Sequence, residues 1–209
     1  MESLFPVKES ISTKQKILEA AIDLFSQNGF SAVSVREITK QVGIKESALY
    51  NHYKTKDEIL ETIYTLFQME QQKSLPPVEQ LEGILKAVSP KDFLLQGFKS
   101  FKHAVSNPLM VKLWRILNIE QYRDSRAREM IIELTYKGTI AFLERAFQIL
   151  IEQNKIKPLE PRLLAYEYQY PIFAAMTEYL LLKLDDADTN ELEQRVESHI
   201  QYFIQNVSN

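Results

Sequence analysis

The sequence of 209 residues contains no cysteine and only five glycines. Without cysteine, neither a disulfide framework nor thiolate chemistry is available to this protein. The sequence also lacks any convincing run in which apolar and polar residues alternate, as they do in half-buried strands. We therefore expect an all-α protein.

A long apolar segment is missing as well. The longest apolar tract, around residues 172–184, is interrupted by Thr177, Glu178 and Lys183, whereas a transmembrane helix needs about 20 predominantly apolar residues. The first ten residues contain acidic side chains and no apolar core of the signal-peptide type. We expect a cytoplasmic protein with no membrane contact.

Sequence motifs that carry catalysis or bind metals are absent too. The chain has no G-x-S-x-G, P-loop, G-x-G-x-x-G or H-E-x-x-H sequence. His103 and His199 are more simply explained as ordinary helical residues than as ligands. We expect no enzymatic activity, no cofactor and no metal site.

The net charge is only −3, which by itself argues against a protein that binds nucleic acid. The charge is unevenly distributed, however. Residues 34–56 contain five Lys or Arg and two Asp or Glu, a local net charge of +3. A local basic cluster of this kind is the electrostatic feature that nucleic-acid-binding elements share.

Apolar residues in the first third recur every three or four positions, as on one face of a helix. They predict a helix over residues 13–28, which starts after Ser12 and stops at Gly29. A second helix starts with a capping box formed by Ser34 and Glu37 and ends at Gly43. A short segment from Ile44 to Tyr53 follows, and then a helix over residues 56–72.

Beyond the Pro76-Pro77 break, which we take as a domain boundary, helices are predicted over residues 90–105, 108–119, 124–154, 161–184 and 189–206. Pro171 predicts a kink in the fourth of these helices.

The helix that starts at Ser34, the turn at Gly43 and the segment 44–53 together form a helix-turn-helix. A short polar helix is unstable alone, so apolar residues such as Leu49 and Tyr53 must hold the second helix against its neighbours. Its outward face is then free to enter a DNA major groove, which is about 12 Å wide.

Residues 33–60, V-S-V-R-E-I-T-K-Q-V-G-I-K-E-S-A-L-Y-N-H-Y-K-T-K-D-E-I-L, resemble the DNA-binding signature of the TetR family of transcriptional regulators. The resemblance covers roughly residues 13–67. It implies an N-terminal DNA-binding domain, residues 1–56, which a helix over residues 56–72 connects to the remainder. Residues 57–209 would then form a larger helical domain that binds an effector and dimerises.

The resemblance also implies DNA contacts. The residues implied are Arg36, Lys45, Glu46, Ser47, Ala48, Tyr50, Asn51, His52, Lys54 and Lys56. Lys45 departs from the family pattern, which often has Ser or Thr there, so the recognition helix lacks its usual N-cap oxygen. A cation at this position opposes the helix dipole but is well placed for a phosphate.

The last two predicted helices contain apolar residues that form a seam. TetR-family proteins pair such helices between two subunits, so the resemblance implies a homodimer interface with Tyr168, Ile172, Met176, Tyr179, Val196, Ile200 and Phe203. The alternative is that these residues form the core of a single chain.

Aromatic side chains in the middle helices offer a candidate pocket for a small-molecule effector, with Phe98, Phe101, Trp114, Tyr136, Tyr170 and Phe173. They could equally be core residues. Arg115 and Glu120 could orient a polar group of the effector or pair on the surface.

The sequence thus predicts a dimeric regulator of the TetR type, more a repressor than an activator, which a small-molecule effector releases from palindromic operator DNA. The alternatives are a helical protein-interaction module or an enzyme on a similar scaffold. The missing catalytic motifs count against an enzyme, and the basic face of the helix-turn-helix counts against an interaction module.

Overall fold

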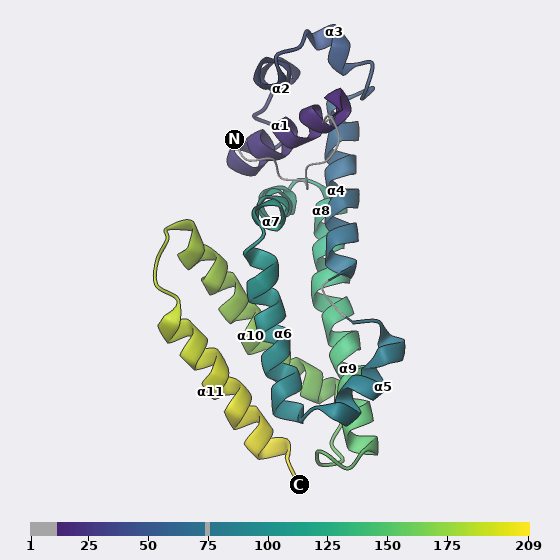
Figure 1. The fold of residues 1–209 in the computed structure, drawn as a ribbon, viewed down its shortest axis with the longest axis vertical. Coiled ribbons are helices and arrows are strands. Elements are labelled where there is room, and N and C mark those ends of the chain that lie inside the picture. The colour runs from purple at the N-terminus through teal and green to yellow at the C-terminus, as the bar shows by residue number, and fades with distance from the viewer. Residues whose placement is uncertain (1–11, 74–75) are drawn as a thin grey trace. The chain divides into compact units, whose positions relative to one another are not determined.

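The computed structural model describes residues 12–73 and 76–209, and every regular element in these two ranges is a helix (Figure 1). This confirms the all-α prediction. The elements are α1 (Thr13–Asn28), α2 (Val35–Val42), α3 (Glu46–Leu49), α4 (Lys56–Gln72), α5 (Val78–Ala87), α6 (Pro90–Val105), α7 (Pro108–Glu120), α8 (Ser125–Met130), the π-helix η1 (Ile131–Lys137), α9 (Gly138–Glu152), α10 (Pro161–Leu184) and α11 (Asn190–Val207). Within the described ranges, no helix is both long and apolar enough to cross a membrane.

Side-chain caps decide where the first helices begin. The Ser12 hydroxyl accepts the backbone N–H of Gln15, and Ser34 forms the full reciprocal capping box with Glu37. The Thr55 hydroxyl accepts the backbone N–H of Glu58 at the start of α4. Each cap satisfies an amide group that the first turn of a helix leaves without a partner. The helices predicted over residues 13–28 and 161–184 have these same boundaries in the structure.

Two predictions about the middle of the chain need correction. The helix α5 lies where the sequence suggested a break without an element, and it has no side-chain cap. The helix predicted over residues 124–154 consists of three elements, because the π-helix η1 separates α8 from α9. A π-helix pairs residues five apart instead of four, so its backbone is locally wider.

One compact unit contains the described residues up to Lys73 together with residues 106–132. In this unit α1 packs against α2, α4 and α7, and α4 also packs against α7. Fully buried apolar side chains from all four helices fill its core, among them Ile17, Phe25, Ile38, Phe67 and Leu113. The N-terminal helices are therefore completed by α7 and α8 from later in the chain. The division by function at residue 56 stays a prediction.

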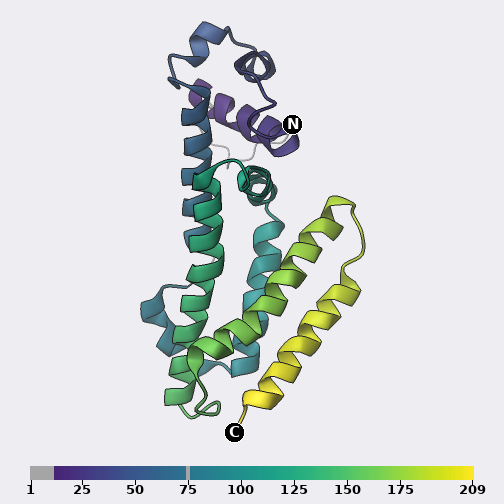
Figure 2. The same cartoon turned by 180° about the vertical axis from the view of Figure 1, so that it is seen from behind.

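The second compact unit contains residues 76–105 and 133–209. The long helix α10 packs against α9 and α11, while α11 also contacts α6 and α5 lies on α9. Figure 2 shows α10 and α11 running antiparallel. Leu94, Phe147, Tyr168 and Ile200 lie in the core of this unit. Pro171 lies inside α10 and has no N–H group, so the helix lacks one backbone hydrogen bond there.

Candidate nucleic-acid interface

The turn between α2 and α3 depends on one glycine. Gly43 has a left-handed backbone (φ 78°, ψ 33°), and its N–H donates to the carbonyl oxygen of Thr39 at 2.9 Å. A residue with a Cβ costs roughly 1–2 kcal/mol in this conformation. A Cβ at Gly43 would find no atom within 4 Å, so backbone conformation alone favours glycine there. The glycine stops α2 and redirects the chain into α3.

The helix α3 has only four residues, and packing holds it in place. Leu49 is fully buried, and Tyr53 just beyond the helix is 1% exposed. The backbone N–H groups of His52 and Tyr53 both donate to the carbonyl oxygen of Leu49, at 2.9 and 3.0 Å. A helix this short has no stability alone. Its two buried side chains therefore set which face of α3 points outward.

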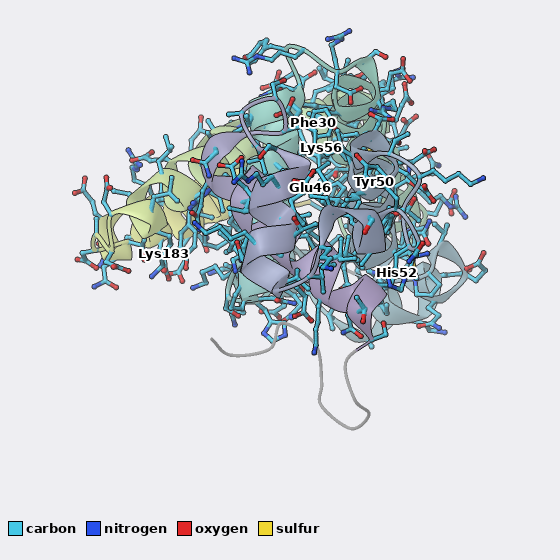
Figure 3. The ribbon with its side chains drawn as sticks, turned by 90° about the horizontal axis from the view of Figure 1, so that it is seen from above. Phe30, Glu46, Tyr50, His52, Lys56 and Lys183 are labelled. Atoms are coloured by element: carbon cyan, nitrogen blue, oxygen red, sulfur yellow. The ribbon has the colours of Figure 1, made fainter. Side chains whose placement is uncertain are left out.

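The predicted DNA contacts lie on this outward side and around it. The exposed ones are Arg36, Lys45, Glu46, Ser47, Tyr50, Asn51 and Lys54, and the half-buried ones are Ala48, His52 and Lys56. Glu46, Tyr50 and His52 are labelled in Figure 3. Tyr50 is 52% exposed, which is high for a large aromatic side chain next to the buried Leu49. The polar residues predicted for DNA binding are thus available to a partner.

Lys45 occupies the N-cap position of α3, as the sequence indicates. Its backbone is extended (φ −76°, ψ 150°), and its side chain makes no capping hydrogen bond. Glu46 supplies an acidic side chain in the first turn, where the helix dipole favours negative charge. The Lys45 side chain is exposed. Its predicted contact with a phosphate stays a prediction.

Lys56, predicted to bind a phosphate, is engaged within the protein. Its Nζ donates to the carbonyl oxygens of Phe30 and Val33, at 2.9 and 2.7 Å, and lies 4.1 Å from the centre of the Phe30 ring (Figure 3). Burial lowers the pKa of Lys56, whereas the nearby carboxylates of Glu120 and Glu37 raise it. Because an ammonium group has three N–H donors, one remains for a further acceptor.

Polar contacts from α8 fix the first turns of α4, beside the helix-turn-helix. The Arg126 guanidinium donates to both carboxylate oxygens of Asp57, at 3.0 and 2.7 Å, and also to Asp124. The Tyr64 hydroxyl donates to the same Asp124 at 3.2 Å. Hydrogen bonding to Arg126 holds the pKa of Asp124 below its usual value. Sequence reasoning missed this network because Arg126 and Asp57 are 69 positions apart.

Residues 17–63, which span α1 to the middle of α4, match the family model of bacterial regulatory proteins of the tetR family. The N-terminal part of this chain is therefore similar to the TetR family. The match includes the turn at Gly43 and the whole of α3.

A curated relative is similar to this chain over part of its length. The chain is 36% identical over 87 residues to the HTH-type transcriptional regulator AcrR of Shigella flexneri, a match that covers 37% of this chain and 40% of AcrR. The match therefore spans less than half of that relative's length. AcrR is named as a transcriptional regulator.

Two solved structures share the fold. A TetR-family transcriptional regulator from Mesorhizobium loti superposes with a TM-score of 0.68 at 18% identity, covering 94% of this chain and 97% of that one. The repressor SmeT of Stenotrophomonas maltophilia, in its triclosan complex, gives a TM-score of 0.64 at 16% identity, covering 94% of this chain and 92% of SmeT. At these identities the likeness concerns the fold.

The structure separates the six aromatic residues predicted for an effector pocket. Trp114 lies in the unit of the helix-turn-helix, where its ring meets that of Phe67 at 5.2 Å. The other five lie in the second unit, in two groups: Phe98 contacts Phe101, and Phe173 contacts Tyr136 and Tyr170. The roles of all six residues stay predictions.

A hollow of about 300 Å³ lies between α10 and α11 in the second unit. Its lining includes Pro171, Arg195 and His199, and none of the six predicted aromatic residues. Sequence reasoning missed this hollow, because small and polar residues line much of it and leave no aromatic pattern.

The seam predicted for the dimer is buried within the single chain. Six of its seven residues, Tyr168, Ile172, Tyr179, Val196, Ile200 and Phe203, are at most 7% exposed, and Met176 is partly buried against the same core. Within a single chain these residues therefore contribute to the core around α10 and α11, and their role in a dimer stays a prediction. Pro171, Arg195 and Tyr202 of the same two helices are exposed.

Proposed function

We propose that this chain is a DNA-binding transcriptional regulator of the TetR type, a repressor that a small-molecule effector releases from a palindromic operator. One observation carries the proposal. The buried Leu49 and Tyr53 hold α3 so that its polar side chains are exposed beside a left-handed glycine turn. A helix presented in this way fits the major groove of DNA.

The predicted DNA-binding residues fall into two groups, those that can contact bases and those that can contact the sugar-phosphate backbone. Ser47 and Asn51 can exchange hydrogen bonds with base edges, and the methyl group of Ala48 suits a thymine methyl group. Glu46 can accept a hydrogen bond from a cytosine amino group. Contacts to sugar and phosphate, which fix the register on the duplex, fall to Arg36, Lys45, Tyr50, His52, Lys54 and the remaining N–H of Lys56.

Recognition of a palindrome requires two copies of the chain. The two recognition helices of a helix-turn-helix dimer meet half-sites about 34 Å apart, or a multiple of this distance. A twofold dimer provides this symmetry, because both subunits use the same surface. We propose that the exposed side of α10 and α11 forms the contact, with Pro171, Arg195 and Tyr202 in place of the buried seam.

Release by an effector would be a population shift. A ligand that binds better to a conformer with a different spacing of the recognition helices lowers DNA affinity by that difference in binding free energy. The structure of a complex between SmeT and triclosan supports small-molecule binding by a protein of this fold. We propose an apolar ligand, because Phe98, Phe101, Tyr136, Tyr170 and Phe173 are the candidate lining. The regulator would act in the cytoplasm, where its DNA target lies.

Substitution of Tyr50 tests this proposal. We expect Tyr50→Ala to weaken binding to duplexes that the wild-type protein selects from random sequence by about tenfold or more, because a hydrogen bond to the charged backbone is lost. The matched control is Tyr122→Ala, which removes a tyrosine that is 86% exposed, far from α3 in the sequence. Fluorescence anisotropy measures both affinities. Equal affinities of the two variants would favour a protein-interaction module over a DNA-binding regulator.

A further inference from the structure

Glu120, the last residue of α7, is a charged residue that the proposed DNA contacts do not use. Its side chain is 2% exposed, so it is neither a surface ion pair nor in reach of a solvent-borne ligand. A carboxylate Oε1 accepts the backbone N–H of Phe30 at 2.8 Å, across 90 positions of sequence. A buried carboxylate is costly unless hydrogen bonds and an opposite charge compensate it. Its presence at this position therefore calls for a role.

The opposite charge comes from Lys56, which contacts the same residue as Glu120 does, namely Phe30. The N–H of Phe30 is bound by Glu120 from α7, while the carbonyl oxygen of Phe30 is bound by Lys56 from α4. Lys56 also binds the carbonyl oxygen of Val33, the residue directly before the N-cap Ser34 of α2. The loop that joins α1 to α2 is thus held at Phe30 and again just before α2 begins. Figure 3 shows Phe30 next to Lys56.

Close packing at Gly29 brings this loop against the end of α7. Gly29 has a φ of +79°, and a Cβ there would lie 3.1 Å from Cγ2 of Ile119 and 3.2 Å from Oε1 of Glu120. At the other end of α7, Lys112 forms an ion pair with Asp23 of α1 at 2.6 Å. The helix α7 is therefore fixed to the N-terminal helices at both of its ends.

We propose that Glu120 is a positioning residue for DNA binding, an inference that rests on the proposed function. From α7 it fixes the backbone of Phe30, and together with Lys56 it sets where α2 begins and hence how α3 is presented. Glu120 itself does not touch DNA. Without it, the loop samples several positions, and the fraction of molecules that is competent to bind DNA falls.

Two substitutions of Glu120 test this inference. Glu120→Ala removes the acceptor for the Phe30 N–H, whereas Glu120→Gln keeps an acceptor oxygen of the same reach. We expect Glu120→Ala to speed hydrogen exchange of the Phe30 amide and to weaken binding to the selected duplexes by roughly tenfold. We expect Glu120→Gln to recover most of the Phe30 protection and part of the affinity. Glu129→Gln, at an exposed carboxylate of α8, controls for the change of charge.

Affinity is measured per folded molecule, with the folded fraction taken from circular dichroism, because a merely structural role would leave this quantity unchanged. If Glu120→Ala does not fold, Glu120→Asp replaces it, since its carboxylate is one methylene shorter and cannot reach the Phe30 N–H in the same position. The inference is overturned if Glu120→Ala, or Glu120→Asp in its place, binds DNA with wild-type affinity per folded molecule. It is also overturned if that variant leaves the exchange rate of the Phe30 amide unchanged. If the wild-type protein selects no duplex, the proposed function fails together with this inference. If the wild-type protein binds DNA but the Glu120 variants bind equally well, only this inference fails.

Discussion

Leu49→Ala is expected to lower the free energy of unfolding by about 2–5 kcal/mol, the range for a fully buried leucine whose removal leaves a cavity. Leu49 is the buried residue of α3, and the other residues of that helix are exposed or half-buried. The short helix then loses the packing that fixes its orientation. We therefore expect DNA binding to be lost together with stability. Urea unfolding followed by circular dichroism measures the stability change.

The control for this prediction is Ser47→Ala in the same helix. Ser47 is exposed, so its replacement should change the free energy of unfolding by less than about 0.5 kcal/mol while it removes a candidate base contact. The two variants thus separate the fold of α3 from its outward chemistry. If Leu49→Ala were as stable as Ser47→Ala, packing could not be what presents the recognition helix.

Gly29→Ala is expected to cost about 2–4 kcal/mol of stability, from a backbone conformation (φ 79°, ψ 160°) that essentially only glycine adopts and from an overpacked contact together. Its φ is +79°, and a Cβ would press on Ile119 and on the Glu120 carboxylate. Thermal and urea unfolding measure this cost. DNA affinity per folded molecule should fall too, because the change pushes α7 away from the Phe30 backbone.

Alanine substitutions at two other glycines serve as comparisons for Gly29→Ala. Gly43 lies in the left-handed helical region (φ 78°, ψ 33°) and a Cβ there meets nothing within 4 Å, so Gly43→Ala carries only the smaller cost of that backbone conformation. Gly97 lies inside α6 with open space around it, and Gly97→Ala should stabilise the protein by about 0.5–1 kcal/mol. Equal losses for Gly29→Ala and Gly43→Ala would contradict close packing between Gly29 and the end of α7.

The helix-turn-helix could be predicted from sequence because the interactions that form it are local. Ser34 with Glu37, Gly43 and the spacing of Leu49 and Tyr53 act within a few residues of one another, so their effect on the backbone follows from sequence order. The same reasoning found the boundaries of α1 and α10. It failed at α5, where no capping side chain follows Pro77 and only Leu81 and Leu85 are buried.

Contacts across long distances in sequence could not be read in this way. The sequence suggests either a ligand-orienting role or a surface ion pair for Glu120, whereas the structure buries it against Phe30. The π-helix η1 keeps a helical pattern of apolar residues and therefore looks like ordinary helix in the sequence. The buried seam of α10 and α11 has the periodicity of an interface, because an intramolecular core and a dimer contact use the same apolar residues.

The most direct test of the account is selection of duplexes from random sequence by the wild-type protein, followed by sequencing. We expect enrichment of an inverted repeat whose half-site centres lie about 34 Å apart, or a multiple of this distance. We also expect that Tyr50→Ala loses this enrichment. No enrichment above the starting pool, or the same enriched sequence with Tyr50→Ala, would contradict the claim that α3 reads operator DNA.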